Sequence, residues 1–248
     1  MEQFEFNTPD GRADGYYFHP EGDGKFPLIL FYMDAFGPRD ALFKMAERLT
    51  SHGFAVFLPN LYYRLGEYLP FDTKTAFNPG PERERIMVML QSLSIEKVIT
   101  DTASLIEFLG KEEKIDINRI GCLGYCMGGK FALAAAYSFP GKVLAAASIH
   151  GGGLVTEHPD SPHLMAPGIK AKVYIGIATN DRSFTELNQI QLEDAFRSAK
   201  VNARKEIYPG ALHGFSIRDS SVYNKQASEL HWERILQLFK ETLVAPGL

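Results

Sequence analysis

Hydrophobic positions along this chain form first an alternating strand pattern and then a succession of strands and helices. Residues 2–7 and 15–19 alternate apolar and polar side chains around a turn cluster at 7–11, which predicts two antiparallel strands. Residues 26–33 form a nearly continuous apolar run, as expected for a central strand buried on both faces. Further strands are predicted at 54–58, 119–123, 143–149, 171–178 and 203–208.

Helical periodicity fills the intervals between these strands, beginning with the spacing of Leu42, Met45 and Leu49. The alternation predicts an α/β fold, with a mostly parallel twisted sheet, helices on both faces and antiparallel N-terminal strands. No repeat, low-complexity segment or linker divides residues 1–248, so a single domain is expected. The other predicted helices are 86–93, 98–109, 127–139, 186–199 and 225–243.

One long segment, residues 59–82, has neither a helical nor a strand period. Loops of that length inside a compact domain are usually functional, and the aromatic content of this one favours a cap or a pocket wall. The alternative is plain packing at the surface. The aromatic side chains are Tyr62, Tyr63, Tyr68, Phe71 and Phe77.

Composition restricts the class of partner. The chain has 248 residues, 45% of them hydrophobic, and its 26 basic and 30 acidic side chains give a net charge of −4 without long blocks of one sign. This pattern favours neither nucleic acid nor an anionic membrane as a partner. The N-terminus lacks a secretory signal and no apolar stretch approaches the ~18 residues of a membrane span, so a cytoplasmic protein is expected.

The two cysteines, Cys122 and Cys126, are expected to be free thiols. Because residue 122 lies in a predicted strand, their Cα atoms should be about 12 Å apart, beyond the ~7 Å limit for a disulfide. Two thiols without a second close pair do not make a zinc site. Cys122 is interpreted as packing inside the sheet, which leaves Cys126 for chemistry.

Cys126 lies at the turn between a predicted strand and a predicted helix, in the stretch Gly124-Tyr125-Cys126-Met127-Gly128-Gly129. This is the nucleophile-elbow pattern Gly-x-Ser-x-Gly with sulfur in place of oxygen. Glycine suits positions 124 and 128 because the turn crowds the strand against the helix. Cys126 is therefore a candidate nucleophile.

The same stretch has two other interpretations. Residues 124–130 match the phosphate loop Gly-x-x-x-x-Gly-Lys, but the next position, which must be Ser or Thr to hold magnesium, is Phe131. Nucleotide hydrolysis is therefore disfavoured. The other possibility is a buried and purely structural Cys126, since free cysteine is among the most often buried residues.

A cysteine nucleophile needs a base, and the base needs an acid that orients it. Functional loops of open α/β sheets lie at the carboxyl ends of strands, and Asp181 and His213 each follow a predicted strand. The order Cys126, Asp181, His213 is the nucleophile, acid, histidine order of α/β-hydrolases. We predict a catalytic triad, although Asp181 alone could cap a turn and His213 alone could be structural.

Two backbone amides are predicted to stabilise an oxyanion. Those of Ala35, after the strand 26–33, and of Met127, after the nucleophile, would converge on the developing negative charge. His150 begins a His-Gly-Gly-Gly stretch that spells an oxyanion motif of lipases, but it lies downstream of Cys126, whereas that motif belongs upstream. His150 is therefore predicted only to line the pocket.

These residues resemble the dienelactone hydrolase family, the carboxymethylenebutenolidase-like members of the α/β-hydrolase superfamily, along most of the chain. The resemblance implies the α/β-hydrolase fold and hydrolysis of strained lactones or esters through an acyl-thioester, without metal or cofactor. The matching elements are residues 124–129, 34–37, 59–62 and 210–215 and the strand end at Asp181.

The resemblance also implies roles for charged residues. Family members usually carry glutamate at the position of Asp34, where it helps to activate the thiol. Asp34 is one methylene shorter, and its alternative role is to cap its loop. Members that act on dienelactone hold its carboxylate with two arginines, and the candidates here, Arg83, Arg85 and Arg218, could equally be solvated surface charges. The other expected substrate contacts are Phe36, Tyr62 and His150.

The sequence thus predicts a cysteine-dependent hydrolase of a small-molecule ester or lactone. The alternative is a catalytically silent α/β-hydrolase fold that binds a ligand or senses thiol chemistry. Two observations keep this alternative open, because cysteine is a poor general esterase nucleophile and Asp34 departs from the family glutamate.

Overall fold

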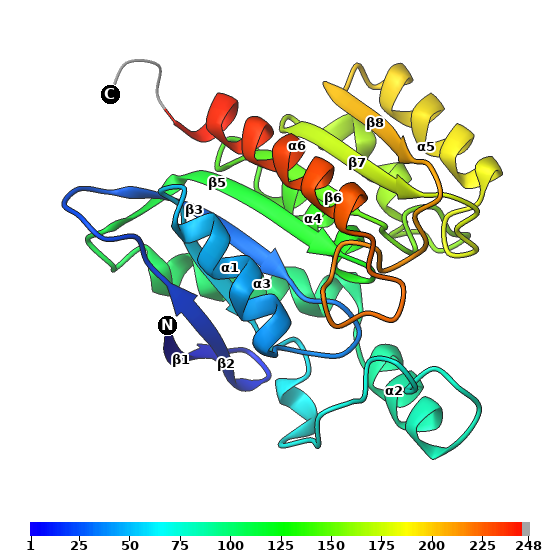
Figure 1. The fold of residues 1–248 in the computed structure, drawn as a ribbon. Coiled ribbons are helices and arrows are strands. Elements are labelled where there is room, and N and C mark those ends of the chain that lie inside the picture. Colours follow the sequence, from blue (N-terminus) through cyan, green and yellow to red (C-terminus); the bar gives the residue numbers. More distant parts are fainter. Residues whose placement is uncertain (245–248) are drawn as a thin grey trace.

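Eight strands form one sheet in the computed structural model, which describes residues 1–244 (Figure 1). The strand order is β1-β2-β4-β3-β5-β6-β7-β8; β2 pairs antiparallel with β1 and β4, and every later pair is parallel. The last four residues of the predicted 1–248 domain lie outside the described part. The strands are β1 (Glu2–Thr8), β2 (Gly11–Phe18), β3 (Phe26–Tyr32), β4 (Ala55–Pro59), β5 (Ile115–Tyr125), β6 (Val143–Ile149), β7 (Lys172–Ala178) and β8 (Ala203–Tyr208).

Helices cover both faces of this sheet, as the alternation of elements predicts. In Figure 1, α1 and α6 lie in front of the sheet and α3 and α4 lie behind it, and contacts of α6 with β5 to β7 and of α4 with β5 and β6 agree with that view. The predicted fold class is thus confirmed. The helices are α1 (Asp40–Thr50), α2 (Pro81–Gln91), α3 (Ile95–Leu109), α4 (Gly128–Ser138), α5 (Glu186–Ser198) and α6 (Lys225–Leu243), with 3₁₀ turns η1 (Tyr63–Leu65) and η2 (Pro162–Gly168).

The buried centre of the sheet is formed by β3, by β6 and by residues 120–125 of β5. Their continuous apolar runs leave no polar face, because a parallel strand between two helical layers is covered on both sides. This buried centre fixes where the carboxyl ends of the strands emerge. The loops that follow those ends therefore start from a rigid edge.

Three elements begin earlier than their hydrophobic pattern indicates. β5 starts at Ile115 because it pairs with Phe26 before a register shift, a pairing that the polar residues Asp116, Asn118 and Arg119 obscure. α2 starts with Pro81 at its first turn, where the missing amide proton costs nothing. α3 starts after Ser94, whose hydroxyl accepts a hydrogen bond from the amide of Lys97 at 3.1 Å.

Residues 60–80 form the long irregular connection expected from the sequence, interrupted only by η1. Its first part is anchored, because Tyr62 is fully buried. Its second part is mostly exposed apart from Phe71 and Ala76, and Phe77 is 47% exposed. Among residues 1–244, no helix is long and apolar enough to cross a membrane.

Candidate active site

Three of the predicted site residues lie just beyond the carboxyl ends of parallel strands. Cys126 follows β5, Asp181 lies three residues beyond β7, and His213 lies in the loop after β8. Parallel strands all end at one edge of a sheet, so side chains from non-adjacent strands can meet there. Cys126, His213 and His150, the residue after β6, line the same cavity.

Cys126 has a positive φ of 53°, a strained conformation for a residue with a side chain. Two neighbouring glycines make the turn possible. A Cβ on Gly124 would lie 2.0 Å from the carbonyl oxygen of Gly128, and a Cβ on Gly128 would lie 2.4 Å from that of Tyr32. Both obstacles are backbone atoms, so any larger residue would displace the turn.

Backbone hydrogen bonds hold this turn from two sides. The amide of Cys126 donates to Ile149 at 3.2 Å, and its carbonyl accepts from the amides of Gly129 and Gly152, each at 3.1 Å. His150, which lies between Ile149 and Gly152 in the sequence, also has a positive φ, of 38°. The turns after β5 and β6 therefore interlock, which keeps the cysteine in its strained conformation.

Asp181 and His213 form a hydrogen-bonded pair. His213 Nδ1 lies 2.7 Å from Asp181 Oδ2, and this carboxylate is 2% exposed. Burial alone disfavours the imidazolium, but the Cys126 sulfur and the hydrogen bond to Asp181 outweigh it and raise the pKa of His213 to about 10. Burial disfavours the charged carboxylate too, yet the contact with His213 and bonds from Ser183 lower the pKa of Asp181. Each partner thus stabilises the charged form of the other.

A third residue, Ser183, contacts both members of this pair and was not predicted from the sequence. Its hydroxyl donates to Asp181 Oδ1 at 2.6 Å, its amide donates to the same oxygen at 2.8 Å, and the hydroxyl oxygen lies 3.0 Å from His213 Nδ1. An Asp-x-Ser stretch after a strand is a local signal for such a turn. The signal could therefore have been found in the sequence.

The cavity around the thiol has a volume of about 300 Å³. Its walls come from the loop after β3, from the second part of the 59–82 segment and from the loop after His213. The aromatic Phe36 and Phe77 lie 5.5 Å apart between ring centroids and form its apolar side. The side chains contributed by the 59–82 segment are Thr73, Lys74, Phe77 and Asn78.

Ala35 and Met127, the predicted oxyanion donors, are both buried and flank the cysteine. Their amides donate no hydrogen bond to any acceptor within residues 1–244. The buried hydroxyl of Tyr62 joins the two residues, because it donates to the Ala35 carbonyl at 2.9 Å and lies 3.6 Å from the Met127 sulfur. Tyr62 thus links the loop that contains Ala35 to Met127.

Asp34 is held by an arginine that sequence reasoning missed. Arg39 donates to both Asp34 oxygens, at 2.7 and 2.8 Å, and to both oxygens of Asp219, at 2.6 and 3.1 Å. The amide of Phe36 also donates to Asp34, at 3.0 Å, in a loop-capping contact. Both oxygens of the Asp34 carboxylate are therefore hydrogen-bonded to groups other than the thiol. Asp34 and Cys126 nevertheless line the same cavity.

The three candidate arginines lie outside the cavity lining. Arg83 is exposed on α2. Arg85 lies over the Phe71 ring at 3.8 Å and pairs with Glu82 at 2.7 Å. Arg218 lines a neighbouring cleft on the far side of the Arg39–Asp219 pair.

His150 is buried, and its Nε2 lies 2.8 Å from the Ser216 hydroxyl. Its ring centroid is 5.1 Å from that of His213. Burial, and then the positive charge on His213, hold the pKa of His150 well below its usual value, so the ring is neutral. Its Nδ1 has no hydrogen-bond partner in the described part of the chain. His150 therefore contributes a neutral wall to the cavity and no second base.

The strand order, the elbow after β5 and the site at the carboxyl edge define an α/β-hydrolase fold. The profile of the dienelactone hydrolase family matches residues 13–243, and the chain belongs to that family. Its fold agrees with the crystal structure of a candidate dienelactone hydrolase from Klebsiella pneumoniae, with a TM-score of 0.83, 21% identity and coverage of 97% of this chain and 98% of the other.

Two curated relatives are named carboxymethylenebutenolidases. A candidate carboxymethylenebutenolidase of Synechocystis sp. is 26% identical over 235 residues, which covers 92% of each chain. Carboxymethylenebutenolidase 1 of Cupriavidus pinatubonensis is 26% identical over 228 residues, covering 92% of this chain and 91% of that protein. The family prediction made from the sequence is therefore confirmed.

Proposed function

We propose that this member of the dienelactone hydrolase family is a cysteine-dependent hydrolase of a small carboxylic ester or lactone, with Cys126, His213 and Asp181 as its triad. The observation that carries the proposal is the 2.7 Å contact between His213 and Asp181 beside a cysteine held at a φ of 53°. A half-buried thiol in a cavity has access to both substrate and base, whereas a structural cysteine needs neither.

The reaction follows from the position of each group. His213 donates from Nδ1 to Asp181, and because its pKa is raised to about 10, its Nε2 already holds the proton drawn from the Cys126 thiol at neutral pH. The sulfur attacks the carbonyl carbon, and the oxyanion accepts hydrogen bonds from the amides of Ala35 and Met127. The carbon–oxygen bond to the leaving group then breaks, and His213 protonates the departing alkoxide. Water, deprotonated by His213, attacks the thioester, which releases the carboxylic acid and restores the thiol.

The cavity supports a small substrate. Its volume of about 300 Å³ is at the lower end of ligand pockets. Phe36 and Phe77 favour an apolar or unsaturated acyl group. Lys74, on the same wall, supplies a positive charge for a polar substituent. We therefore place the substrate among short esters and lactones with an apolar face.

The acyl-enzyme can be trapped to test the nucleophile. A panel of small esters and lactones is mixed with the protein, quenched in acid within the first turnovers and examined by intact and peptide mass spectrometry. We expect one acyl group on the peptide with Cys126 and none on Cys122, because burial raises the pKa of the Cys122 thiol and excludes the reagent. Turnover without an acylated cysteine would refute the proposed intermediate.

The silent-fold alternative rests on Asp34, because Arg39 occupies both of its carboxylate oxygens. Labelling with iodoacetamide as a function of pH separates the two functions. Rapid labelling of Cys126 at neutral pH together with ester turnover supports the hydrolase. A thiol that reacts only above about pH 8, without turnover of any ester, supports a silent fold.

Ser183→Ala is expected to reduce kcat by about threefold to tenfold with little effect on KM. The substitution removes one charge-assisted hydrogen bond to Asp181, which water replaces in part because Ser183 is exposed. Ser104→Ala on α3, which removes an i to i−4 hydroxyl bond far from the site, is the matched control and should leave kcat unchanged. Equal rates for Ser183→Ala and wild type would exclude a role for this hydroxyl.

The pH dependence of kcat/KM should reflect the raised pKa of His213. The imidazolium that protonates the leaving group persists through neutral pH and is lost as the pH rises through about 10, so kcat/KM falls there. Asp181→Asn removes a hydrogen bond that favours the imidazolium, and the alkaline limb should move to lower pH. An alkaline limb at the same pH in both proteins, after subtraction of spontaneous hydrolysis, would rule out this assignment.

A further inference from the structure

A second cleft lies between α1, the loop of residues 216–223 and the start of α6. Its volume is about 500 Å³. Arg39 and Asp219 line both this cleft and the cavity with Cys126, and their ion pair separates the two spaces. The proposed catalytic groups do not line the cleft. We call it the α1–α6 cleft.

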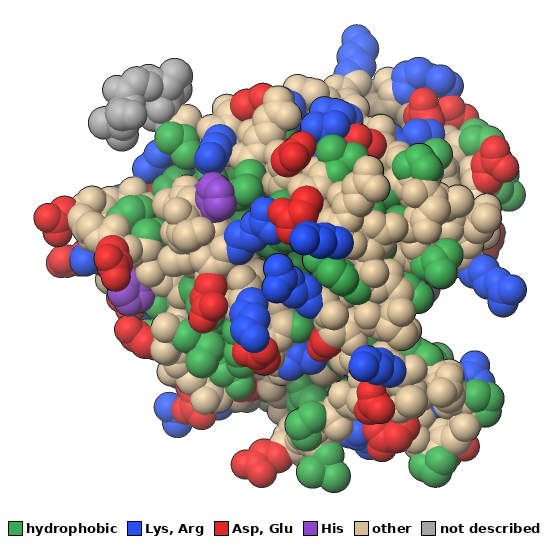
Figure 2. Space-filling model, viewed as in Figure 1, with side chains coloured by type: hydrophobic (Ala, Val, Ile, Leu, Met, Phe, Trp, Pro, Cys, Tyr) green, Lys and Arg blue, Asp and Glu red, His purple; other side chains and the backbone are tan. Residues whose placement is uncertain are grey.

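Basic side chains gather around the α1–α6 cleft. Figure 2 shows Lys and Arg side chains collected on the face where α1 and α6 lie in Figure 1. Four cations and three carboxylates line the cleft, in a chain whose overall net charge is −4. Arg39 is also paired with Asp34 outside the cleft, so the cation that no carboxylate pairs with in the described part of the chain is Arg218. The cations are Arg39, Lys44, Arg48 and Arg218, and the carboxylates are Asp40, Asp219 and Glu229.

All three carboxylates are already paired. Arg39 binds both oxygens of Asp219, and Arg48 binds both oxygens of Glu229, at 3.0 and 2.7 Å. Lys44 binds Asp40 at 2.6 Å. The acceptors of the cleft are thus occupied by its own cations.

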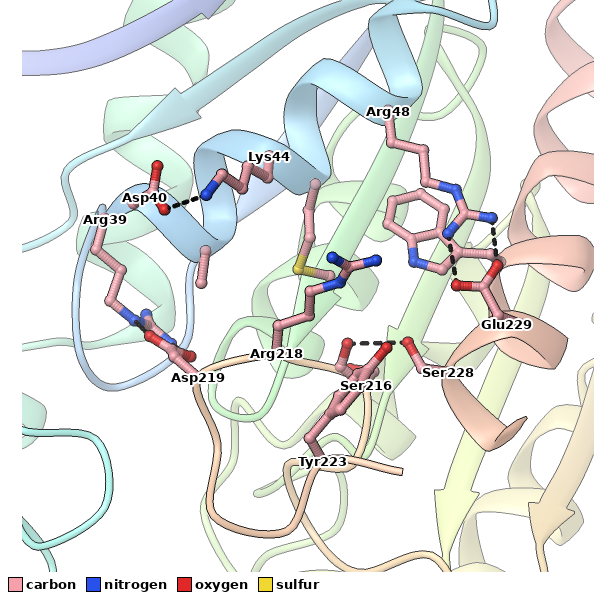
Figure 3. A pocket seen from close by; sticks show the side chains of 13 residues that line it. Arg39, Asp40, Lys44, Arg48, Ser216, Arg218, Asp219, Tyr223, Ser228 and Glu229 are labelled. Atoms are coloured by element: carbon pink, nitrogen blue, oxygen red, sulfur yellow. Dashed lines mark hydrogen bonds and ion pairs between the residues drawn. The ribbon is translucent and has the colours of Figure 1, made fainter. Parts of the chain in front are cut away.

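The donors are not all occupied. Arg218 makes no hydrogen bond or ion pair within residues 1–244, and the Tyr223 hydroxyl has no partner there either. Figure 3 shows the Arg218 guanidinium extending into the space between α1 and α6, with Arg48 beyond it. The positive charge of Arg218 contributes to lowering the pKa of Glu229, after the hydrogen bond and charge of Arg48. The hydrogen-bonding capacity left in the cleft therefore belongs to donors.

Apolar atoms form the floor beneath these donors. Arg48 stacks on the Trp232 ring, with its guanidinium carbon 4.6 Å from the centroid, and Met45 lies beside them with 7% exposure. The stacking and the pair with Glu229 fix the Arg48 side chain. A ligand with one anionic group and a small apolar body could accept hydrogen bonds from these donors and pack against the apolar floor.

We propose that the α1–α6 cleft is a second binding site, for a small molecule that bears a carboxylate or phosphate group. Arg218 is its principal ligand, through two of its N–H donors, and the Tyr223 hydroxyl adds a third hydrogen bond. None of the three proposed triad residues lines this cleft. Its occupancy can therefore be measured whether or not Cys126 is a nucleophile.

Calorimetric titration of the full chain with inorganic phosphate and with succinate, at constant ionic strength, tests the site. We expect saturable binding of at least one anion, and its preference for one probe identifies the anionic group. Arg218→Ala should weaken that binding by about tenfold or more, because a charge-assisted hydrogen-bond pair is lost. Arg83→Ala, which removes an exposed guanidinium from α2, is the matched control and should leave the affinity unchanged.

A second measurement separates the α1–α6 cleft from the cavity with Cys126. Protein alkylated with iodoacetamide at Cys126 should bind the anion with unchanged affinity. Three results would overturn the proposal: no saturable binding of either anion, equal affinity in Arg218→Ala and wild type, or loss of binding after alkylation. Circular dichroism of Arg218→Ala should match wild type, because the exposed side chain supports no other contact.

Discussion

Cys126→Ala is expected to lower kcat/KM for small esters by at least about 10³-fold, which brings hydrolysis close to the spontaneous rate. The reason is that alanine leaves the cavity, the proposed oxyanion amides and the His213–Asp181 pair in place but removes the atom that forms the acyl bond. Ester hydrolysis followed at neutral pH, with the burst of the first turnover recorded, measures the loss.

Cys122→Ala is the matched control for this prediction. Cys122 lies four residues upstream in the same strand and is fully buried, so its loss should lower the free energy of unfolding by on the order of 1 kcal/mol and leave kcat/KM nearly unchanged. Turnover by Cys126→Ala at the rate of wild type would contradict the proposed nucleophile. Loss of turnover in both variants would instead point to a fold that tolerates no change in β5.

Gly124→Ala is expected to lower the free energy of unfolding by more than about 2 kcal/mol and to abolish rapid labelling of Cys126. The new Cβ would lie 2.0 Å from the carbonyl oxygen of Gly128, and the first turn of α4 cannot yield without losing the turn around Cys126. Chemical denaturation gives the stability, and the rate of iodoacetamide labelling gives the state of the elbow.

Gly152→Ala is the control for the elbow substitution. A Cβ at that position would meet Ser183 at 3.4 Å, an ordinary contact, and the backbone there has no positive φ. Its stability should lie within about 1 kcal/mol of wild type. If Gly124→Ala were as stable as Gly152→Ala, crowding at the elbow would not be the reason for glycine.

The fold was largely predictable because its signals are local. Apolar runs such as residues 26–33 are typical of strands covered on both faces, and the alternation with helical spacings leaves few arrangements other than a parallel sheet. The strand ends then indicate which loops share an edge. For the same reason the sequence placed Cys126, Asp181 and His213 in the loops after β5, β7 and β8.

The charged groups around the cavity were harder to predict because the fold, and not their spacing in the sequence, decides which partners they meet. Arg39 meets Asp219 across 180 residues, and only the folded chain brings the loop after β3 against the loop after His213. The guanidinium of Arg85 instead donates to the Leu69 carbonyl and lies over the Phe71 ring. A single sequence does not distinguish an arginine that faces a cavity from one that covers an aromatic side chain.

The position of Tyr62 divides the 59–82 segment into a buried anchor and an outer part that lines the cavity. The buried half of the 59–82 segment ties the Ala35 loop to Met127 through one hydroxyl. The outer part, with Thr73, Lys74, Phe77 and Asn78, lines the cavity, and the Thr73 hydroxyl donates to the Asp219 carbonyl at 2.7 Å. In the proposed hydrolase, substitutions of Lys74, Phe77 or Asn78 would therefore change the cavity that receives the substrate. The same substitutions would leave in place the Tyr62 contacts with Ala35 and Met127.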